Sequence, residues 1–307
     1  MLHEYTTITF PGLGLEMDPI RYLEIGSLKL YIYGLIIAIG LLLAVSYAWS
    51  RCKQFGIKED HLTDGVLCVV PFAILCARAY YCIFQWEEQF AANPLSVFYI
   101  WNGGLAIYGG VIGAAIGVAV YAKVRKIKLP ALLDMVALGF LIGQAVGRWG
   151  NFFNREAFGA ETDFFLRMGL TDAYGRVTYH HPTFLYESLW NTIGFVLLHF
   201  LSKKRKYDGQ IALGYVFWYG FGRTIIEGLR TDSLYVGPFR VSQLLAAVSC
   251  AVAMIVLLVM MFKEHDPAKL YVNQVAALEA ETDEDDEEED DEEEEDEEEE
   301  QQEKPEE

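Results

Sequence analysis

Seven long apolar runs restrict this chain to a membrane fold. A helix needs about 20 apolar residues to cross a bilayer, and each run approaches or exceeds that length. Continuous runs separated by charged links are typical of helices, whereas a barrel would show short alternating strands. The predicted fold class is therefore all-α polytopic, with seven transmembrane helices. The runs are Leu28–Ser50, Thr63–Phe84, Gly103–Ala122, Ala131–Gly147, Phe184–Leu201, Ile211–Ile226 and Val241–Phe262.

The charge of the chain is concentrated at its C-terminal end. The whole sequence carries −19, although 53% of its residues are hydrophobic. Residues 279–307 carry −22, so residues 1–278 carry +3. A segment of this composition repels itself and cannot bury enough apolar surface to fold. The sequence predicts a membrane domain over 1–278 and a disordered acidic tail over 279–307.

Lysine and arginine collect in alternate links between the runs. They occupy 51–58, 123–128 and 203–206, with Lys263 after the last run, and the 85–102 link has none. Because basic links stay in the cytoplasm, an odd number of spans puts the N-terminus and the 148–182 segment outside. The C-terminus and its tail are then cytoplasmic. The five cysteines have no metal-ligand spacing, so neither a metal nor a cofactor is expected.

Thirteen residues from Gly147 to Gly159, GRWGNFFNREAFG, place two arginines, two amides and a carboxylate at the end of an apolar run. A charge at membrane depth costs roughly 2.5–3.5 kcal/mol on insertion scales, which makes such a cluster a candidate functional site. The alternative is a helix end where arginines extend to the headgroups and Asn and Gly cap the chain.

A second polar group lies in the sixth run and beyond it. On a continuous helix Arg223, Glu227 and Arg230 would be spaced i, i+4 and i+7 and share one face, where the carboxylate could hold both cations. A structural ion pair buried in the bundle is the alternative interpretation. Two arginines on one face favour a functional site, with Glu227 orienting them.

The pattern G-R-x-G-N-F-x-N-x-E-x-x-G resembles the signature of the prolipoprotein diacylglyceryl transferases, and further stretches resemble the same family in the same order. They are Tyr31–Gly34, Trp101–Gly110, His181–Glu187 and Tyr219–Arg223. The resemblance implies an enzyme of the bacterial inner membrane. It would transfer the diacylglyceryl group of phosphatidylglycerol to the lipobox cysteine of a prolipoprotein signal peptide, form a thioether and release glycerol phosphate.

The resemblance also implies site residues. Its expected partners are phosphatidylglycerol, signal peptides and membrane lipids, without nucleic acid. The expected catalytic residues are Arg148 and Arg223 at the phosphate, with Tyr33, Asn151 and Glu227. The expected substrate contacts are Arg148, Gly104, Tyr108, Asn154, Gly159, His181, Tyr186, Glu187 and Arg230. Arg155 is expected at the headgroup surface.

Two departures bear on the base that deprotonates the thiol. The family often has a histidine where this chain has Tyr108, and an aromatic residue paired with histidine near Tyr31. A histidine base at those positions is therefore not expected, and His181 is an ionisable alternative. A transporter or channel for an anionic solute is the rival class, but the polar residues crowd the outer end of the bundle and do not line a path across it.

Overall fold

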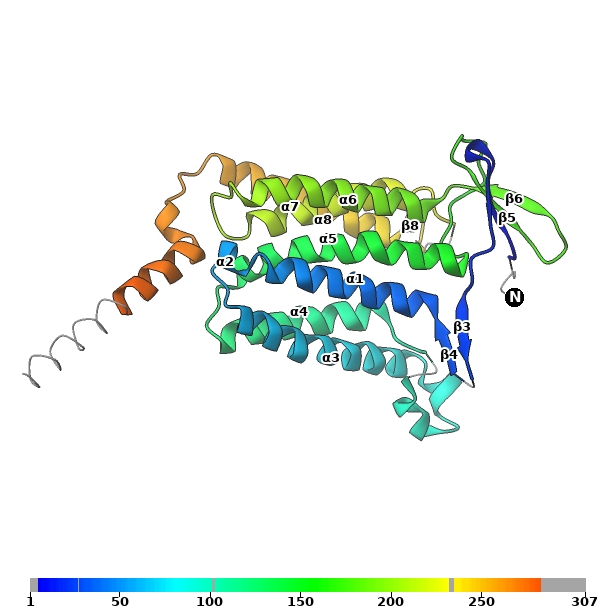
Figure 1. The fold of residues 1–307 in the computed structure, drawn as a ribbon, viewed down its shortest axis with the longest axis horizontal. Coiled ribbons are helices and arrows are strands. Elements are labelled where there is room, and N and C mark those ends of the chain that lie inside the picture. Colours follow the sequence, from blue (N-terminus) through cyan, green and yellow to red (C-terminus); the bar gives the residue numbers. More distant parts are fainter. Residues whose placement is uncertain (1–4, 27, 101–102, 232–234, 283–307) are drawn as a thin grey trace, which may run out of the picture.

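Six helices of the computed structural model are long and apolar enough to cross a membrane, and they pack side by side (Figure 1). They are α1 (Ile32–Trp49), α3 (Glu59–Phe84), α4 (Ile107–Val124), α5 (Leu129–Asn154), α6 (Thr183–Ser202) and α8 (Val241–Met261). A further helix, α7 (Gln210–Glu227), packs against α5, α6 and α8. The structure describes residues 5–26, 28–100, 103–231 and 235–282. The prediction of a multi-pass helical membrane protein is confirmed for six of the seven expected spans.

Two differences between the helix bounds and the apolar runs bear on the candidate site. The first run begins with a strand, β4 (Leu28–Tyr31), before α1 starts. Helix α5 continues seven residues beyond the expected end at Gly147, and Arg155 ends it in a left-handed conformation with φ of 54°. The polar stretch from Arg148 to Asn154 is therefore helical, and its side chains follow helical spacing.

Glycines let neighbouring helices approach closely. A Cβ atom added to Gly109 of α4 would lie 2.4 Å from the Cβ of Tyr80 on α3, and one added to Gly113 would lie 2.5 Å from the Cβ of Cys76. Any side chain at these positions would force the two helices apart. Small residues at such contacts are typical of membrane helices.

The all-α prediction omitted several short strands. Strands β1 (Ile8–Phe10), β2 (Leu15–Met17), β5 (Met168–Thr171) and β6 (Val177–His180) form an antiparallel sheet in the order β2-β1-β5-β6. Two hairpins accompany it, β3 (Tyr22–Ile25) with β4, and β7 (Tyr235–Val236) with β8 (Phe239–Arg240). The sheet lies beyond one end of the helices (Figure 1). The fold is thus mostly helical, with a small β cap that lies at one end.

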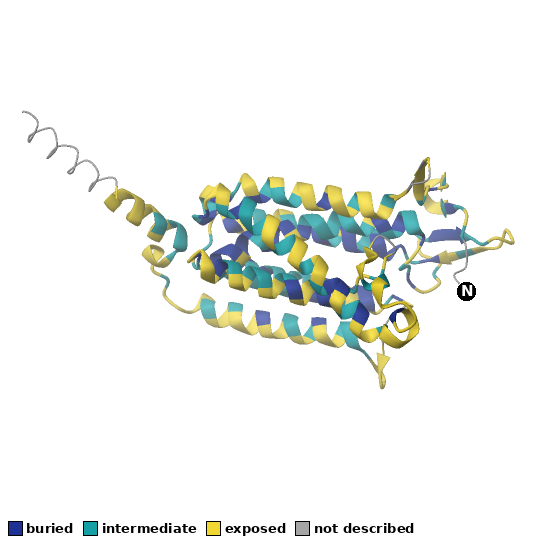
Figure 2. Cartoon of the chain, turned by 90° about the horizontal axis from the view of Figure 1, so that it is seen from below, coloured by how far each residue is buried: buried dark blue, intermediate teal, exposed yellow. Residues whose placement is uncertain are grey.

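A hydrophobic cluster joins this sheet to the bundle. Ile8, Phe10, Met168 and Leu170 from the sheet pack with Phe152 of α5 and Phe184 of α6. A second cluster fills the opposite half of the bundle, while the outward faces of the helices are largely exposed (Figure 2). Apolar faces that turn outward suit contact with lipid. The first cluster fixes the end of α5 against the start of α6.

The opposite end of the bundle holds the basic links, α2 (Cys52–Phe55) and the C-terminal segment (Figure 1). Residues 271–282 are helical. The first four residues of the expected tail, 279–282, therefore continue this helix, and residues 283–307 lie outside the described part of the chain.

Candidate active site

Glu187 near the start of α6 is the centre of an ion cluster. Its carboxylate is only 4% exposed and contacts three guanidinium groups. The Nη2 of Arg148 lies 2.6 Å from Oε2, and the Nη1 atoms of Arg223 and Arg230 lie 3.0 and 3.4 Å from Oε1. The three arginines come from the end of α5, the end of α7 and the segment after α7. The structure thus brings together four residues predicted for the site.

Glu227 holds Arg223 from the same helix. Its Oε2 lies 2.7 Å from the Nη2 of Arg223, as the i, i+4 spacing predicted. The expected position of Arg230 on that helix is wrong, because α7 ends at Glu227. Beyond that point the backbone pairs with another segment, since Arg230 forms a bridge with Gly159. Arg230 therefore reaches Glu187 from outside the helix.

The cluster keeps cationic groups accessible. The side chains of Arg148 and Arg223 are 22% and 16% exposed, whereas those of both carboxylates are nearly buried. Each guanidinium carries five N–H donors in a planar fork that fits carboxylate or phosphate. Glu187 and Glu227 engage some of these donors and fix the orientation of the rest. Such an arrangement is suited to binding an anionic ligand.

A chain of amides extends the site past Arg148. The Nη1 of Arg148 donates to the Oδ1 of Asn151 at 3.4 Å, which confirms that the two share a helical face. Asn151 and Asn154 both donate to the Oε1 of Glu156, at 3.0 and 3.2 Å. Glu156 was not among the predicted site residues. The signal was present, since Glu156 is the carboxylate of the GRWGNFFNREAFG stretch.

Tyr33 packs against the same helix at Gly150, the residue before Asn151. A Cβ atom added to Gly150 would lie 2.5 Å from the Cδ2 of Tyr33, so only glycine leaves room for the ring. The structure thus explains why a glycine stands between Arg148 and Asn151. Tyr33 makes no hydrogen bond with the described residues of the cluster, and it lies beside the site as an aromatic wall.

Gly104 and Tyr108 lie apart from the arginine cluster, in the segment before α4 and in the first turn of that helix. Gly104 has φ of 78°, and a Cβ atom there would lie 2.5 Å from the Nη1 of Arg78. Arg78 is buried and donates to the carbonyl oxygens of Ser96, Val97, Gly103 and Gly104 at 2.7–2.9 Å. Tyr108 is 48% exposed, and within the described chain it has no hydrogen bond to the arginine cluster. The structure therefore does not join these two predicted residues to Glu187.

Arg78 was missed by the sequence reasoning. The available signal was an arginine inside the apolar run Thr63–Phe84. Its guanidinium donates hydrogen bonds to four backbone carbonyl oxygens of the segment between α3 and α4. Arg78 thus shapes the loop that carries Gly104.

Gly159 and His181 lie where the 155–160 segment crosses the start of α6. The amide of Gly159 donates to the carbonyl of His181 at 2.9 Å, and a Cβ atom at Gly159 would lie 2.8 Å from the Cβ of His181. The ring of His181 is 3.3 Å from the Tyr186 hydroxyl. Burial lowers the pKa of His181 below its usual value, which favours the neutral ring.

Arg155 is not at the headgroup surface, and that expectation is wrong. Arg155 is only 7% exposed. Its Nη2 donates to Asp18 Oδ1 at 2.5 Å and to the Thr6 carbonyl at 2.7 Å. The cause is the N-terminal segment, which folds over the end of α5 next to β1. Arg155 therefore ties that segment to the helix that carries Arg148.

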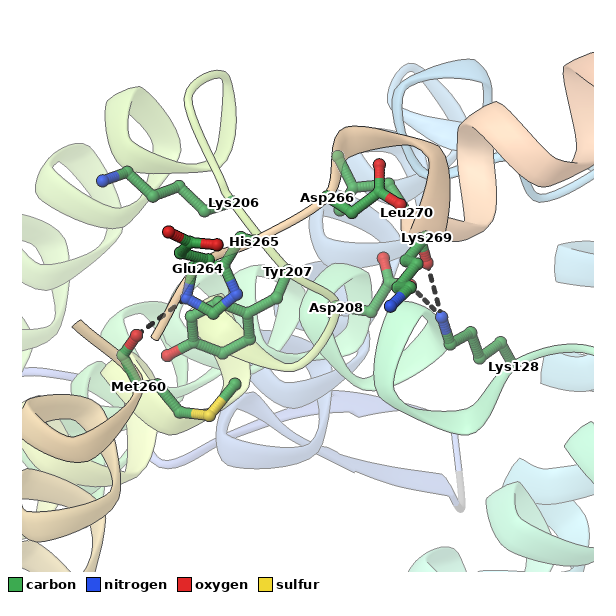
Figure 3. A pocket seen from close by; sticks show the side chains of 10 residues that line it. All are labelled: Lys128, Lys206, Tyr207, Asp208, Met260, Glu264, His265, Asp266, Lys269 and Leu270. Atoms are coloured by element: carbon green, nitrogen blue, oxygen red, sulfur yellow. Dashed lines mark hydrogen bonds and ion pairs between the residues drawn. The ribbon is translucent and has the colours of Figure 1, made fainter. Parts of the chain in front are cut away.

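A pocket of about 530 Å³ lies at the opposite end of the bundle, and Figure 3 shows its lining. The ring of His265 stacks on that of Tyr207, and its Nε2 donates to the Met260 carbonyl at 2.7 Å. Lys128 is engaged by Asp208 at 2.9 Å and by the Lys269 carbonyl at 2.8 Å. These polar groups hold the C-terminal segment in place.

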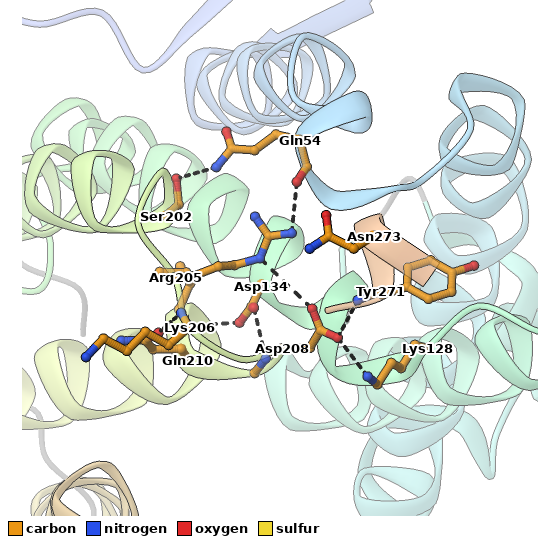
Figure 4. A network of polar contacts seen from close by, with 12 residues as sticks. Gln54, Lys128, Asp134, Ser202, Arg205, Lys206, Asp208, Gln210, Tyr271 and Asn273 are labelled. Atoms are coloured by element: carbon orange, nitrogen blue, oxygen red, sulfur yellow. Dashed lines mark hydrogen bonds and ion pairs between the residues drawn. The ribbon is translucent and has the colours of Figure 1, made fainter. Parts of the chain in front are cut away.

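A buried polar network lies beside this pocket (Figure 4). Asp134 of α5 is fully buried and accepts the amides of Gly209, Ile211 and Ala212 at 2.8–2.9 Å. Asp208 accepts the Tyr271 amide at 2.9 Å. The first carboxylate caps the N-terminus of α7, and the second holds the first residue of the C-terminal helix.

Comparison with known proteins identifies relatives over most of the chain. The family model described as prolipoprotein diacylglyceryl transferase matches residues 21–260. A Listeria monocytogenes protein (serotype 4a, strain HCC23) is 42% identical over 244 residues, which cover 76% of this chain and 87% of that protein. Its name is phosphatidylglycerol–prolipoprotein diacylglyceryl transferase.

Two further relatives carry the same name. A Clostridium novyi protein (strain NT) is 41% identical over 250 residues, covering 79% of this chain and 95% of the relative. A Bacillus cereus protein (strain G9842) is 44% identical over 243 residues, covering 77% and 90%. The matched range contains every residue of the ion cluster around Glu187.

Proposed function

This chain belongs to the prolipoprotein diacylglyceryl transferase family, and from that premise we propose that it transfers the diacylglyceryl group of phosphatidylglycerol to a cysteine thiol of a prolipoprotein. The arginine cluster around Glu187 carries the proposal. Arg148 and Arg223 present partly exposed guanidinium groups within reach of one buried carboxylate. A phosphodiester is the anion that such paired forks fit best.

The reaction forms one bond and breaks another at the same carbon. The cysteine thiolate attacks the diacylglyceryl carbon that bears the phosphate oxygen. A carbon–sulfur bond forms, the carbon–oxygen bond breaks, and glycerol phosphate leaves with the bonding electrons. The thiol proton passes to a base or to solvent. Negative charge therefore accumulates on the phosphate as the carbon–oxygen bond breaks.

Arg148 and Arg223 stabilise that developing charge. Their donors are already oriented by Glu187 and Glu227, so little reorganisation is needed during the reaction. The same cations favour the thiolate form of an approaching cysteine, because nearby positive charge lowers the pKa of a thiol. Asn151 and Asn154 lie next to Arg148 and offer donors and acceptors to a glycerol headgroup. We also assign substrate contacts to Tyr33, Gly159, His181 and Tyr186.

The proposed orientation follows from the two ends of the bundle. The basic links gather at the end that holds α2 and the C-terminal helix. Helix α5, whose last turns carry Arg148, runs from that end toward the sheet (Figure 1). By the distribution of basic residues, the cluster faces outward from a bacterial inner membrane. The N-terminus is then outside and the C-terminus cytoplasmic, with α7 as the seventh span.

Reconstitution tests this function directly. The purified chain is placed in vesicles with phosphatidylglycerol labelled in its headgroup glycerol, and a lipobox peptide is added. We expect labelled glycerol phosphate to appear in step with lipidated peptide, and no release with a Cys→Ser peptide. Absence of coupled products from a folded protein would overturn the proposal. Movement of an anionic solute across sealed vesicles without lipidation would favour a transporter instead.

A further inference from the structure

One helical turn deeper than the arginine cluster, three helices each supply an uncharged polar side chain. Gln144 is four residues before Arg148 on α5, and Tyr219 is four residues before Arg223 on α7. Asn191 is four residues after Glu187 on α6. Four residues correspond to about 6 Å along a helix and keep the same face. Because α6 starts at the end where α5 and α7 finish, all three side chains lie further into the bundle.

Asn191 stands out because its carbonyl oxygen is unpaired. The residue is 1% exposed, and among the described residues its Oδ1 has no hydrogen-bond partner. The Oε1 of Gln144 is also buried without a partner, although the Nε2 of Gln144 donates to the Tyr215 hydroxyl at 2.9 Å. Folded proteins leave few buried polar atoms unpaired, so each one needs an explanation. Of the two, Asn191 belongs to a helix that also carries Glu187, so its unpaired oxygen is a candidate acceptor for a bound group.

Asn191 lines a small pocket together with Glu187 and Arg223 of the arginine cluster. The pocket is lined by Glu187, Trp190, Asn191, Tyr219, Gly222, Arg223 and Ile226. It therefore places the uncharged amide of Asn191 in the same pocket as the Arg223–Glu187 ion pair.

The wall of this pocket is rigidly constructed. The rings of Trp190 and Trp218 stack with centroids 4.4 Å apart, and each indole Nε1 donates to the other residue's carbonyl at 2.9–3.0 Å. Trp190 also lies across Gly222, where a Cβ atom would be 2.1 Å from the indole Nε1. The two indoles fix α6 against α7, so they fix the position of Asn191 relative to Arg223.

We propose that Asn191 accepts a hydrogen bond from an O–H or N–H group of a bound substrate while the arginines hold the phosphate. The inference rests on the proposed transferase function and adds a contact that selects the substrate. Two substrate groups carry the required donor: the headgroup glycerol of phosphatidylglycerol, and the peptide backbone near the lipobox cysteine. A site built to pair with such a donor discriminates strongly against analogues that lack it.

The test is Asn191→Leu, which keeps the shape of the side chain and removes the acceptor. We expect kcat/KM for transfer to fall about 3- to 10-fold, the effect of one hydrogen bond. We expect the unfolding temperature to stay the same or rise, because an unpaired buried carbonyl is removed. Asn191→Ser, which retains an acceptor, should recover part of the activity.

Thr192→Val is the matched control. Its hydroxyl donates to the Ser188 carbonyl of the same helix at 2.8 Å, so it is a neighbouring polar group with a satisfied bond. We expect this variant to keep the transfer rate of the wild type. A loss of activity in Asn191→Leu that runs parallel to a fall in unfolding temperature would overturn the inference, because that pattern indicates a structural role.

A lipid comparison separates the two sources of the donor. Phosphatidylglycerol is compared with phosphatidylpropanol, whose headgroup lacks free hydroxyls, by the rise in unfolding temperature that each lipid causes. If the headgroup is the donor, the wild type prefers phosphatidylglycerol and Asn191→Leu loses that preference. If the peptide is the donor, the lipid preference stays and KM for the peptide rises.

Unchanged lipid preference together with unchanged KM values in Asn191→Leu would overturn the inference. A wild type that transfers nothing would overturn the proposed function instead. In that case the lipid comparison, which needs no turnover, still decides whether Asn191 contacts the headgroup.

Discussion

Both ends of the bundle contain buried carboxylates, but the groups that these carboxylates bind differ. At the basic end Asp134 accepts three backbone amides, and Asp208 accepts Lys128 and the Tyr271 amide. At the end beside the sheet Glu187 is shared by three arginines, and the side chains of Arg148 and Arg223 stay partly exposed. The first arrangement uses its charges to fix helix ends. The second holds its cations in place and leaves them able to meet an anion.

The largest expected effect comes from removing Arg148 or Arg223. We expect Arg148→Ala and Arg223→Ala each to abolish diacylglyceryl transfer, a loss of at least about 100-fold, because each removes donors from the developing phosphate charge. Arg148→Lys and Arg223→Lys should retain only a small fraction, since lysine lacks the planar fork. Transfer is measured in phosphatidylglycerol vesicles with folding checked. Turnover near that of the wild type in either alanine variant would refute a phosphate site built from the two arginines.

Glu187→Gln tests whether the shared carboxylate organises those cations. The neutral side chain leaves Arg148, Arg223 and Arg230 close together with less compensating charge. We expect transfer to fall by about 100-fold through misplacement of the guanidinium groups, together with a lower unfolding temperature. A variant that is as active as the wild type would show that Glu227 and the bilayer suffice to position the arginines.

Asp134→Ala makes the corresponding change at the basic end. It leaves the amides of Gly209, Ile211 and Ala212 without their acceptor, and we expect a destabilisation of about 3 kcal/mol. Transfer per folded molecule should stay within about twofold of the wild type. Unfolding in detergent and a folded-fraction assay measure the two quantities. A selective loss of turnover would contradict the division between structural and functional ends.

His181 gives a smaller effect that depends on pH. Burial lowers its folded-state pKa below the unfolded value of about 6.5. The contribution of the neutral ring to stability is therefore fully present above that unfolded value and is lost as pH falls through the folded pKa. We expect the wild type to lose more stability than His181→Gln between pH 7 and pH 5. Equal pH profiles of unfolding temperature would refute this.

Truncation after Leu278 should have the smallest effect. The Lys58–Glu279 pair that it removes is 3.7 Å long and exposed on both sides, and such pairs contribute roughly 0–1 kcal/mol. The start of the helix remains held by Asp208 and Tyr271. We expect transfer within about twofold of the full chain in the same vesicles. Loss of transfer in a folded truncation would show that residues 279–307 affect the arginine cluster at the other end.

The arginine cluster around Glu187 shows which contacts can be predicted from local sequence. Arg148 and Asn151 are three residues apart on one helix, and Arg223 and Glu227 are four apart, so their contacts follow from helical spacing alone. The approach of Glu187 to Arg148 and Arg223 depends on how three helices pack. No spacing within one segment contains that information, although the resemblance had already placed Glu187 among the substrate contacts.

The errors have the same origin. Arg155 is buried because the N-terminal segment folds back and places Asp18 beside it, a contact over 137 residues of sequence. Arg230 leaves the helix because its backbone bridges to Gly159. The sheet was missed because its strands have only three or four residues each, too few for a periodic pattern.

The sequence by itself determined that this chain crosses a membrane and where most of its helices lie, because length, hydropathy and helical periodicity are local properties. Only the tertiary structure decided that Glu187 is the shared partner, that Arg78 and Arg155 are structural, and that Asn191 has an unpaired oxygen beneath the cluster. Whether a buried polar atom is satisfied depends on every segment packed around it. That property exists only once the helices have assembled.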